Sequence, residues 1–310
     1  MNNIDKKFEN LVNQIKLFSL DDIFNIIKRN LLFIPKKTLH SLENYLCNVN
    51  YWGTLNVEKN DFTEVYEKAK SLKEHIDDYV WLYNSLNDYK SKTLLYGILN
   101  NWYRYDFTTL DIASEKTYKH YFDLDIIPNC KDEVIADLGA YVGDTTLDFI
   151  ETYGKESYNK IYCYEITDST FSILKTNLFE YKNIIYKNLG VSDKEGILYL
   201  NSKEDFSSNQ ITTNGNKEVK TTSLDIDISE PLTMIKMDIE GAEQSAILGC
   251  KSHIINDNPK LLISVYHNNE DLWKIPRMIH SINSNYNYYL RYYGGCIFPT
   301  EIVFFAIPKK

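Results

Sequence analysis

The sequence predicts an α/β fold, a mostly parallel sheet covered by helices, preceded by an all-α N-terminal domain. From residue 1 to about 117, apolar residues recur only at the three- and four-residue spacing of helices. Beyond Pro128, short β-branched runs alternate with helical segments, which indicates βαβ units. These runs are continuously apolar, as strands buried on both faces require. At 310 residues the chain has room for two domains, which we place at 1–117 and 118–310.

The N-terminal domain is expected to contain several amphipathic helices. One apolar stripe includes Phe8, Leu11 and Ile15, and a second begins at Ile23. Ser19 lies between the two stripes and suits a helix cap. Further helical stripes are expected at about 37–47, 61–88 and 90–104.

The second domain is expected to hold seven strands. They are predicted at 133–138, 161–166, 184–190, 232–238, 260–266, 286–292 and 301–307. The last two flank Gly294 and Gly295 at short spacing and should pair as a terminal antiparallel ribbon. Residues 202–222 are polar and rich in Ser, Thr and Asn, which predicts a loop or a hairpin insertion.

Charge and cysteine usage limit the classes of partner and compartment. With 34 basic and 43 acidic residues the net charge is -9, which argues against a nucleic-acid partner attracted by bulk electrostatics. Five scattered cysteines without a C-x-x-C pair indicate neither a disulfide framework nor a structural zinc site. No signal-like N-terminus and no uncharged apolar run of spanning length is present. We expect a cytoplasmic protein without a membrane span.

A glycine-containing turn follows the first predicted strand. The strand leads into Asp137, then Gly139 and Gly143, and a helix is expected to open at Asp144 and Thr145. Glycines permit a sharp turn and the close approach of a ligand to the backbone, although such turns also arise for steric reasons alone. The G-x-x-x-G spacing differs from the dinucleotide fingerprint and disfavours an NAD-dependent oxidoreductase.

Acidic residues follow two further strands. Glu165 stands at the end of the second strand, where an open α/β sheet places the carboxylate that accepts hydrogen bonds from ribose hydroxyls. Asp238 and Glu240 follow the fourth strand and can both point into the crevice, or one of them can cap the next helix. After the third strand, Ser192 or Asp193 would reach an adenine edge, unless they form an ordinary turn.

Two motifs together resemble a known family. The segments D-L-G-A-Y-V-G-D-T at 137–145 and I-K-M-D-I-E-G-A-E at 235–243 are similar to the FkbM family of class I S-adenosylmethionine-dependent methyltransferases. The likeness extends over roughly 118–308 and includes Tyr121–Asp123 and Val265–Pro276. It implies a Rossmann-like seven-stranded sheet with a terminal antiparallel strand. It also implies O-methylation, most often of a sugar in a secondary metabolite or in a bacterial surface glycan such as capsule, lipopolysaccharide or flagellar glycan.

The resemblance assigns the cofactor site. Asp137, Gly139 and Gly143 would hold the methionine end of S-adenosylmethionine, and Glu165 the ribose, with Asp238 beside the sulfonium. The product would be S-adenosylhomocysteine. The other residues expected to line the cofactor are Ala140, Tyr141, Asp144, Thr145, Ile166, Ser192 and Asp193.

Transfer to a hydroxyl requires a base, because the proton must leave as the C–O bond forms. His267, at the end of the fifth strand, suits that role, and Glu240 is the competing base. A divalent metal held by Asp238, Glu240 and His267 is the less favoured alternative, since the ligand spacing is weak, and we expect no metal. Tyr121, Tyr266 and Trp273 are expected near the acceptor.

The identity of the acceptor stays open at this point. A small molecule or a glycan fits best, and an amino or phosphate group remains an alternative to a hydroxyl. A chain that kept the cofactor pocket as a non-catalytic nucleotide-binding scaffold is the rival of a different class. The N-terminal domain would cover the acceptor site or form a homo-oligomer.

Overall fold

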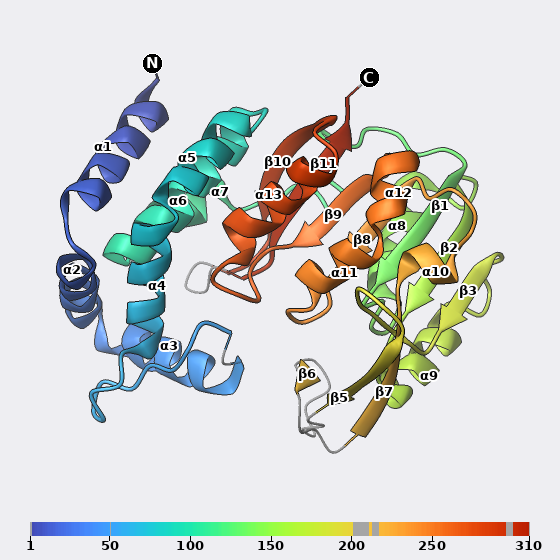
Figure 1. The fold of residues 1–310 in the computed structure, drawn as a ribbon, viewed down its shortest axis with the longest axis horizontal. Helices are drawn as coiled ribbons and strands as arrows, with labels where there is room; N and C mark the ends of the chain where they lie inside the picture. The colour runs from blue at the N-terminus through green and yellow to red at the C-terminus, as the bar shows by residue number, and fades with distance from the viewer. Residues whose placement is uncertain (1, 50, 201–210, 213–216, 296–299, 310) are drawn as a thin grey trace. The chain divides into compact units, whose positions relative to one another are not determined.

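The computed structural model describes residues 2–49, 51–200, 211–212, 217–295 and 300–309 (Figure 1). The helices are α1 (Asn3–Leu17), α2 (Leu20–Phe33), α3 (Lys36–Val49), α4 (Thr63–Glu74), α5 (Ile76–Ser85), α6 (Tyr89–Arg104), α7 (Thr108–Ala113), α8 (Asp144–Tyr153), α9 (Asp168–Asn177), α10 (Leu224–Asp227), α11 (Glu243–Gly249), α12 (Lys251–Asn256) and α13 (Asp271–Ile282). The strands are β1 (Glu133–Leu138), β2 (Tyr158–Tyr164), β3 (Ile184–Lys187), β4 (Gly190–Val191), β5 (Gly196–Leu200), β6 (Ile211–Thr212), β7 (Lys217–Thr222), β8 (Met234–Met237), β9 (Lys260–Ser264), β10 (Tyr286–Tyr292) and β11 (Ile302–Pro308).

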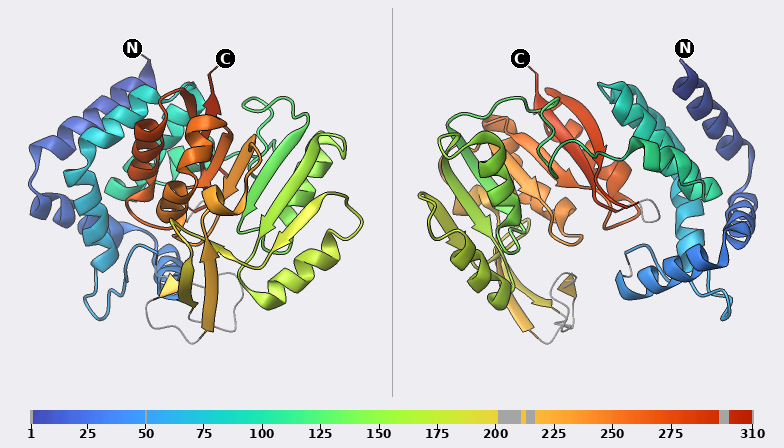
Figure 2. Two further views of the ribbon diagram at one scale, coloured as in Figure 1. Left: turned by 45° about the vertical axis from the view of Figure 1, so that its right-hand side comes forward. Right: turned by 180° about the vertical axis from the view of Figure 1, so that it is seen from behind.

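The predicted fold class is confirmed. Seven strands form one sheet in the order β10-β11-β9-β8-β1-β2-β3, mostly parallel and with antiparallel strands at its end. The antiparallel strand β11 lies between β9 and β10, so the last two strands form the expected ribbon. Helices α8 and α9 cover one face of the parallel strands, and α11 and α12 cover the other (Figure 2).

The predicted helices of the N-terminal region are present, with two differences in detail. The stretch 61–88 divides at His75 into α4 and α5, and the short helix α7 was not predicted. Ser19 caps α2, because its side chain accepts from the backbone N–H of Asp22 while Asp22 accepts from the N–H of Ser19. No described helix is long and apolar enough to cross a membrane. The four cysteines among the described residues, Cys47, Cys130, Cys163 and Cys250, carry free thiols, and Cys296 lies outside them.

A second, smaller sheet was only partly predicted. Its order is β4-β7-β5-β6, and β5 and β7 run antiparallel as a hairpin. The described parts of the polar stretch 202–222 are β6 and β7, which both pair antiparallel with the preceding strand β5. Residues 201–210 and 213–216 lie outside the described residues. The strand β5 was not predicted, since it is only five residues long.

Chain contacts divide the protein into two compact units. The helical unit comprises Met1–Glu115, Val265–Arg277 and Tyr288–Phe304. The sheet unit comprises Lys116–Ser264, Met278–Asn287 and Phe305–Lys310. The helical unit thus includes two segments from late in the sequence, so these units do not coincide with the predicted cut near residue 117, and the division into 1–117 and 118–310 stays a prediction.

Within the helical unit, α6 is the central helix. It packs against α1, α2, α4 and α7. The apolar residues of α6 are buried on several sides of the helix, among them Leu94, Ile98 and Trp102. A helix that is apolar over most of its surface is stable only when other helices cover it.

The outer edge of β10 is covered by residues of the N-terminal region. The backbone N–H of Asn87 donates to the carbonyl of Tyr288 at 2.9 Å, and the N–H of Glu115 donates to the carbonyl of Tyr292 at 2.6 Å. The N–H of Leu290 donates to the Ser91 hydroxyl at 2.9 Å. These bonds satisfy backbone groups that an edge strand would otherwise expose.

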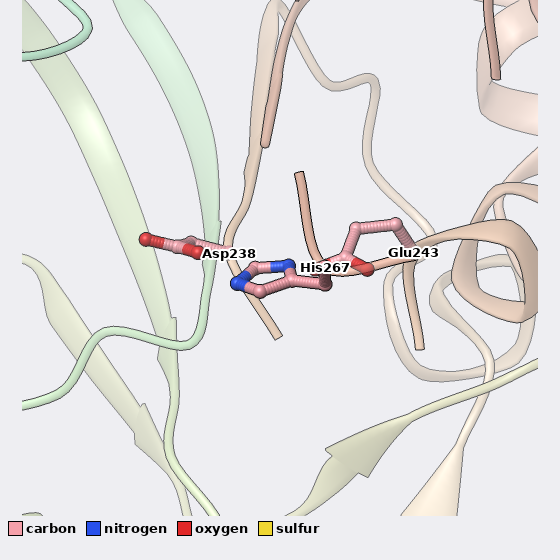
Figure 3. Close-up of side chains that lie close together, drawn as sticks. All are labelled: Asp238, Glu243 and His267. Carbon is pink, nitrogen blue, oxygen red and sulfur yellow. The ribbon is translucent and has the colours of Figure 1, made fainter. Parts of the chain in front are cut away.

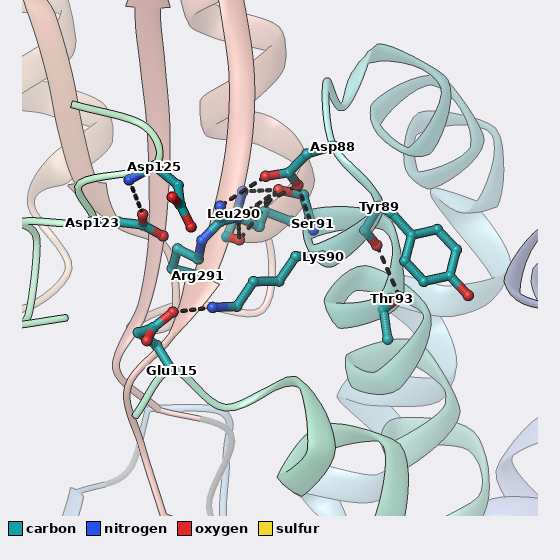
Figure 4. A network of polar contacts seen from close by, with 10 residues as sticks. All are labelled: Asp88, Tyr89, Lys90, Ser91, Thr93, Glu115, Asp123, Asp125, Leu290 and Arg291. Carbon is teal, nitrogen blue, oxygen red and sulfur yellow. Dashed lines mark hydrogen bonds and ion pairs between the residues drawn. The ribbon is translucent and has the colours of Figure 1, made fainter. Parts of the chain in front are cut away.

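An ion pair between a buried arginine and a half-buried aspartate reinforces this edge (Figure 4). The guanidinium of Arg291, 2% exposed, donates from Nη2 to Asp88 Oδ2 at 2.7 Å. Asp88 also caps α6, because it accepts from the N–H of Ser91 at 2.7 Å. Burial raises the pKa of Asp88, but the hydrogen bonds from Arg291 and Ser91 outweigh it, and the pKa lies below its ordinary value.

The first prediction concerns this ion pair. Arg291→Met leaves the Asp88 carboxylate without its cationic partner, and we expect the free energy of unfolding to fall by about 3 kcal/mol at pH 7 in urea titrations. Because the pKa of Asp88 is depressed in the folded state, the wild-type advantage is present above about pH 4 and is lost as the pH falls further.

The matched control is Lys16→Met, which removes an ion pair with Asp77 whose side chains are 49% and 81% exposed. It should cost less than about 1 kcal/mol. Equal losses for the two variants, or a loss for Arg291→Met that does not shrink in acid, would contradict the role given to this pair.

Candidate functional site

The glycine turn, Glu165 and Asp238 lie at the carboxyl ends of the adjacent parallel strands β1, β2 and β8. In register, Asp137 of β1 lies opposite Cys163 of β2 on one side and Lys236 of β8 on the other. The chain leaves these strands at Gly139, Glu165 and Asp238, so the residues that sequence analysis selected lie along the same sheet edge. Ligands of open α/β sheets bind at this edge.

The glycine turn is fixed by contacts with the neighbouring strand ends. The N–H groups of Gly139 and Ala140 both donate to the carbonyl of Tyr164, at 3.0 and 2.9 Å. Gly139 has a φ of 76°, and a Cβ at this position would lie 1.9 Å from the carbonyl oxygen of Asp238. A glycine is therefore required here by the protein's own backbone. Gly143, with a φ of 86°, precedes α8 and packs against Leu174.

Asp137 is held inside the sheet unit rather than presented at its surface. Its Oδ1 lies 3.1 Å from the ammonium of Lys236, and its Oδ2 accepts from the Thr146 hydroxyl at 2.9 Å. Asp137 and Lys236 are 2% and 4% exposed. The carboxylate predicted to touch the cofactor thus links β1, β8 and the first turn of α8.

Lys236 was not selected from the sequence, although it belongs to the quoted motif. Its ammonium also donates to the carbonyl of Gly139 at 2.7 Å. Burial opposes the charge, but Asp137 and then Asp238 outweigh it, so the pKa of Lys236 is raised above its ordinary value. Its place within an otherwise apolar strand could have pointed to Lys236, because a buried charge requires a partner of opposite charge.

Glu165 is buried directly after β2, as predicted. Its Oε1 accepts from the N–H of Thr167 at 2.7 Å, and its Oε2 from the N–H of Tyr141 at 3.2 Å. Burial raises the pKa of this carboxyl, against the opposing effect of the hydrogen bonds from Thr167 and Tyr141. Ile166, the next residue, is half-buried. Tyr141, Asp144 and Thr145 of the glycine turn reach the surface at least in part.

Ser192 and Asp193 lie where the small sheet meets α11. The Ser192 hydroxyl is 3.0 Å from the Ser245 hydroxyl, which also accepts from the N–H of Asp193 at 3.3 Å. The carbonyl of Ser192 would lie 1.9 Å from a Cβ on Gly249. Their polar groups thus fasten a turn to α11, and the role predicted for them toward adenine stays a prediction.

Asp238 accepts a hydrogen bond from a buried tyrosine. The hydroxyl of Tyr121 donates to Asp238 Oδ2 at 2.8 Å and is 2.9 Å from the Ser264 hydroxyl at the end of β9. Tyr121 is 1% exposed and its hydroxyl orients Asp238, and the contact with the acceptor that the sequence predicts for it stays a prediction. His120 stacks on the Tyr121 ring with centroids 4.0 Å apart, and burial lowers the pKa of His120 to about 4.

The I-E-G-A-E segment contains two acids, Glu240 and Glu243. Glu240, which the sequence proposes as a base, is the acid that α11 does not bury. Glu240 adopts a φ of 56° and is half-buried. Glu243 is fully buried in the first turn of α11 and accepts from the N–H of Ile239 at 2.9 Å. Asp238 directly follows β8 and Glu243 is the first residue of α11, so both of these side chains belong to the sheet unit (Figure 3).

The remaining predicted residues belong to the helical unit. His267 is 2% exposed, and its ring lies 5.2 Å from that of Tyr51 and 4.2 Å from that of Tyr266. Trp273 is half-buried and stacks on His75 with centroids 3.8 Å apart. Tyr51 was not selected from the sequence, since nothing in the local pattern links it to a residue more than two hundred positions later.

The second prediction concerns the buried pair of the sheet unit. Lys236→Met leaves the Asp137 carboxylate buried without its cation, and we expect the free energy of unfolding to fall by about 3–5 kcal/mol. Adding Asp137→Asn removes the uncompensated charge, so the double variant should recover most of that loss in the same urea titrations. If the second substitution adds a further loss instead, the two side chains are not coupled as the geometry indicates.

Comparison with known proteins agrees with this geometry. Residues 137–290 match the model of the methyltransferase FkbM domain. The structure of methyltransferase FkbM from Methylobacillus flagellatus KT has a TM-score of 0.66 and 22% identity, over 85% of this chain and 69% of that one. No curated protein matches.

More distant folds also match. Fibrillarin from Aeropyrum pernix, with bound S-adenosyl-L-methionine, has a TM-score of 0.37 and 12% identity, over 57% of this chain and 67% of its own. Ribosomal protein L11 methylase from Lactobacillus delbrueckii subsp. bulgaricus has a TM-score of 0.37 and 16% identity, over 58% and 71%. The domain match and the strand order together identify residues 137–290 as a methyltransferase domain of the FkbM family.

Proposed function

We propose that this chain is an S-adenosylmethionine-dependent O-methyltransferase acting on a hydroxyl of a sugar or sugar phosphate, in the biosynthesis of a bacterial surface glycan. The observation that carries the proposal is the placement of the glycine turn and Glu165 at the carboxyl ends of β1 and β2 within an FkbM domain. In an open α/β sheet, this is where a nucleoside ligand binds.

The donor set at this edge fits the cofactor. A carboxylate offers about four acceptor positions. Backbone N–H groups use one on each oxygen of Glu165, and the Thr167 side chain also hydrogen-bonds to this carboxylate. A position therefore remains for a ribose hydroxyl. The turn from Gly139 to Gly143 is held by Tyr164 and Lys236, so its shape does not depend on a ligand. S-adenosylmethionine, when bound there, supplies a methyl group on a sulfonium.

Asp238 is the acid we place nearest the reacting groups. Its carboxylate is oriented by the Tyr121 hydroxyl, which Ser264 in turn contacts. A negative charge at this position favours a cationic sulfonium and an acceptor hydroxyl that donates to it. Tyr121 would affect the reaction through its hydrogen bond to Asp238.

We assign His267 as the general base. A neutral imidazole accepts the hydroxyl proton as the new C–O bond forms, and this proton transfer contributes roughly 10²–10⁴-fold in known enzymes. Glu240 is the competing base. Tyr266 precedes His267 directly and Trp273 follows it six residues later. We assign both to the acceptor site, where aromatic rings would stack on a sugar. We favour catalysis without a metal.

The third prediction concerns the binding of the cofactor and the chemical class of the acceptor. Calorimetry should show S-adenosylmethionine binding to the wild type, and Glu165→Gln should weaken it at least about tenfold because one charge-assisted hydrogen bond is lost. Glu180→Gln, an exposed acid of the same unit, is the control and should bind as the wild type does. Labelled methyl should appear on a hydroxyl of a nucleotide sugar, a sugar phosphate or an oligosaccharide in a panel of these acceptors.

The same assays separate the assigned roles. His267→Asn should keep the wild-type affinity for S-adenosylmethionine and lose at least about a hundredfold in kcat, while the exposed His280→Asn should change neither. Binding without transfer to any acceptor would favour a scaffold, and label on nitrogen or phosphate would overturn O-methylation. Unchanged kcat for His267→Asn would move the base to Glu240 or to a metal.

A further inference from the structure

We propose that the N-terminal region positions the catalytic base: Trp52 and Ser71 hold the backbone on both sides of His267. This rests on the proposed function only in calling His267 the base. Both residues lie outside 137–290, so the family domain does not supply them. All the contacts that carry the proposal lie within the helical unit.

Trp52 acts on the peptide group that joins Tyr266 to His267. Its indole Nε1 donates to the carbonyl oxygen of Tyr266 at 2.8 Å, and Trp52 is 4% exposed. That carbonyl and the backbone nitrogen of His267 share one planar unit. The hydrogen bond therefore fixes the plane from which the His267 side chain extends.

Ser71 acts on the other side of His267. Its hydroxyl donates to the carbonyl of Asn269 at 3.3 Å and lies 2.7 Å from the hydroxyl of the buried Tyr79. The ring of Tyr51 meets the His267 ring at an interplanar angle of 70°. The three N-terminal residues thus contact the ring of His267 and the backbone before and after it.

Trp52 is itself anchored by a buried ion pair of α4. Lys68 pairs with Glu64, and these side chains are 4% and 1% exposed. The ammonium of Lys68 lies 5.8 Å from the Trp52 ring centroid and 5.0 Å from that of Tyr105, within the range of a cation–π contact. Tyr105 donates to Glu64 at 2.9 Å. The position of the indole is therefore set by the helices rather than by the loop that it holds.

Fixing the base in this way has a kinetic consequence. Proton transfer depends steeply on the distance and angle between the base and the acceptor hydroxyl, and misplacement of a catalytic group by 1 Å costs about a hundredfold. Residues that touch neither cofactor nor acceptor then affect kcat while leaving cofactor affinity unchanged. That pattern distinguishes positioning of the base from general loss of folding.

The test compares two tryptophans of the helical unit. Trp52→Phe removes the donor to Tyr266 and keeps an aromatic ring. Trp102→Phe removes the same N–H from an equally buried tryptophan whose Nε1 has no hydrogen-bond partner among the described residues. We expect kcat to fall about tenfold or more in Trp52→Phe, with the wild-type dissociation constant for S-adenosylmethionine, and to be unchanged in Trp102→Phe.

A second measurement needs neither cofactor nor acceptor. The Cε1–H resonance of His267, assigned by its absence in His267→Asn, reports the surroundings of the ring by NMR. We expect it to shift in Trp52→Phe and to stay in place in Trp102→Phe. This NMR measurement tests whether Trp52 positions His267 even if the wild type transfers no methyl group. Failure of this proposal can therefore be told apart from failure of the proposed function.

Two results would overturn the proposal. One is a Trp52→Phe variant whose His267 resonance and kcat match those of Trp102→Phe. The other is a shifted resonance with wild-type kcat, which would reduce Trp52 to a structural residue. If Trp52→Phe does not fold, as judged by circular dichroism, Ser71→Ala takes its place, and the same two readouts should move in the same direction.

Discussion

The site depends on the buried pair of Lys236 and Asp137. An ammonium inside a parallel sheet is stable only where opposite charge and acceptors surround it. Asp137 and the Gly139 carbonyl meet that need from β1, and Thr146 satisfies the second oxygen of the carboxylate from α8. One cation therefore links two strands, a helix and the turn between them. The contacts of Glu165 and Asp238 are arranged around a frame that this pair fixes.

Much of the sheet was predictable, because buried parallel strands leave a signal that local sequence carries. Continuous apolar runs located all seven strands, and the acid after β2 was found where it lies. Contacts across the sheet were not predictable from spacing. The motif indicated Asp137 as a site residue. Only the register with β8 shows that its carboxylate forms an ion pair with Lys236.

Two other features of the site have the same physical origin. Glu240 and Glu243 are both acids at the start of a helix, and the turn at Gly241 decides which one the helix buries. Trp52 is separated from Tyr266 by most of the chain, and no periodicity reports a contact between residues so distant. Local pattern finds elements, whereas the partners of buried polar groups are determined by packing.

The covering of β10 has a consequence for the order in which the protein forms. Asn87, Ser91 and Glu115 emerge from the ribosome long before Tyr288, Leu290 and Tyr292, to which they are hydrogen-bonded. Contacts between residues so far apart in sequence slow folding, because the entropy of closing the loop is lost before the contact forms. The hydrogen bonds that join the N-terminal region to β10 thus form only after the last strands have been synthesised, and a chain truncated before residue 288 lacks them.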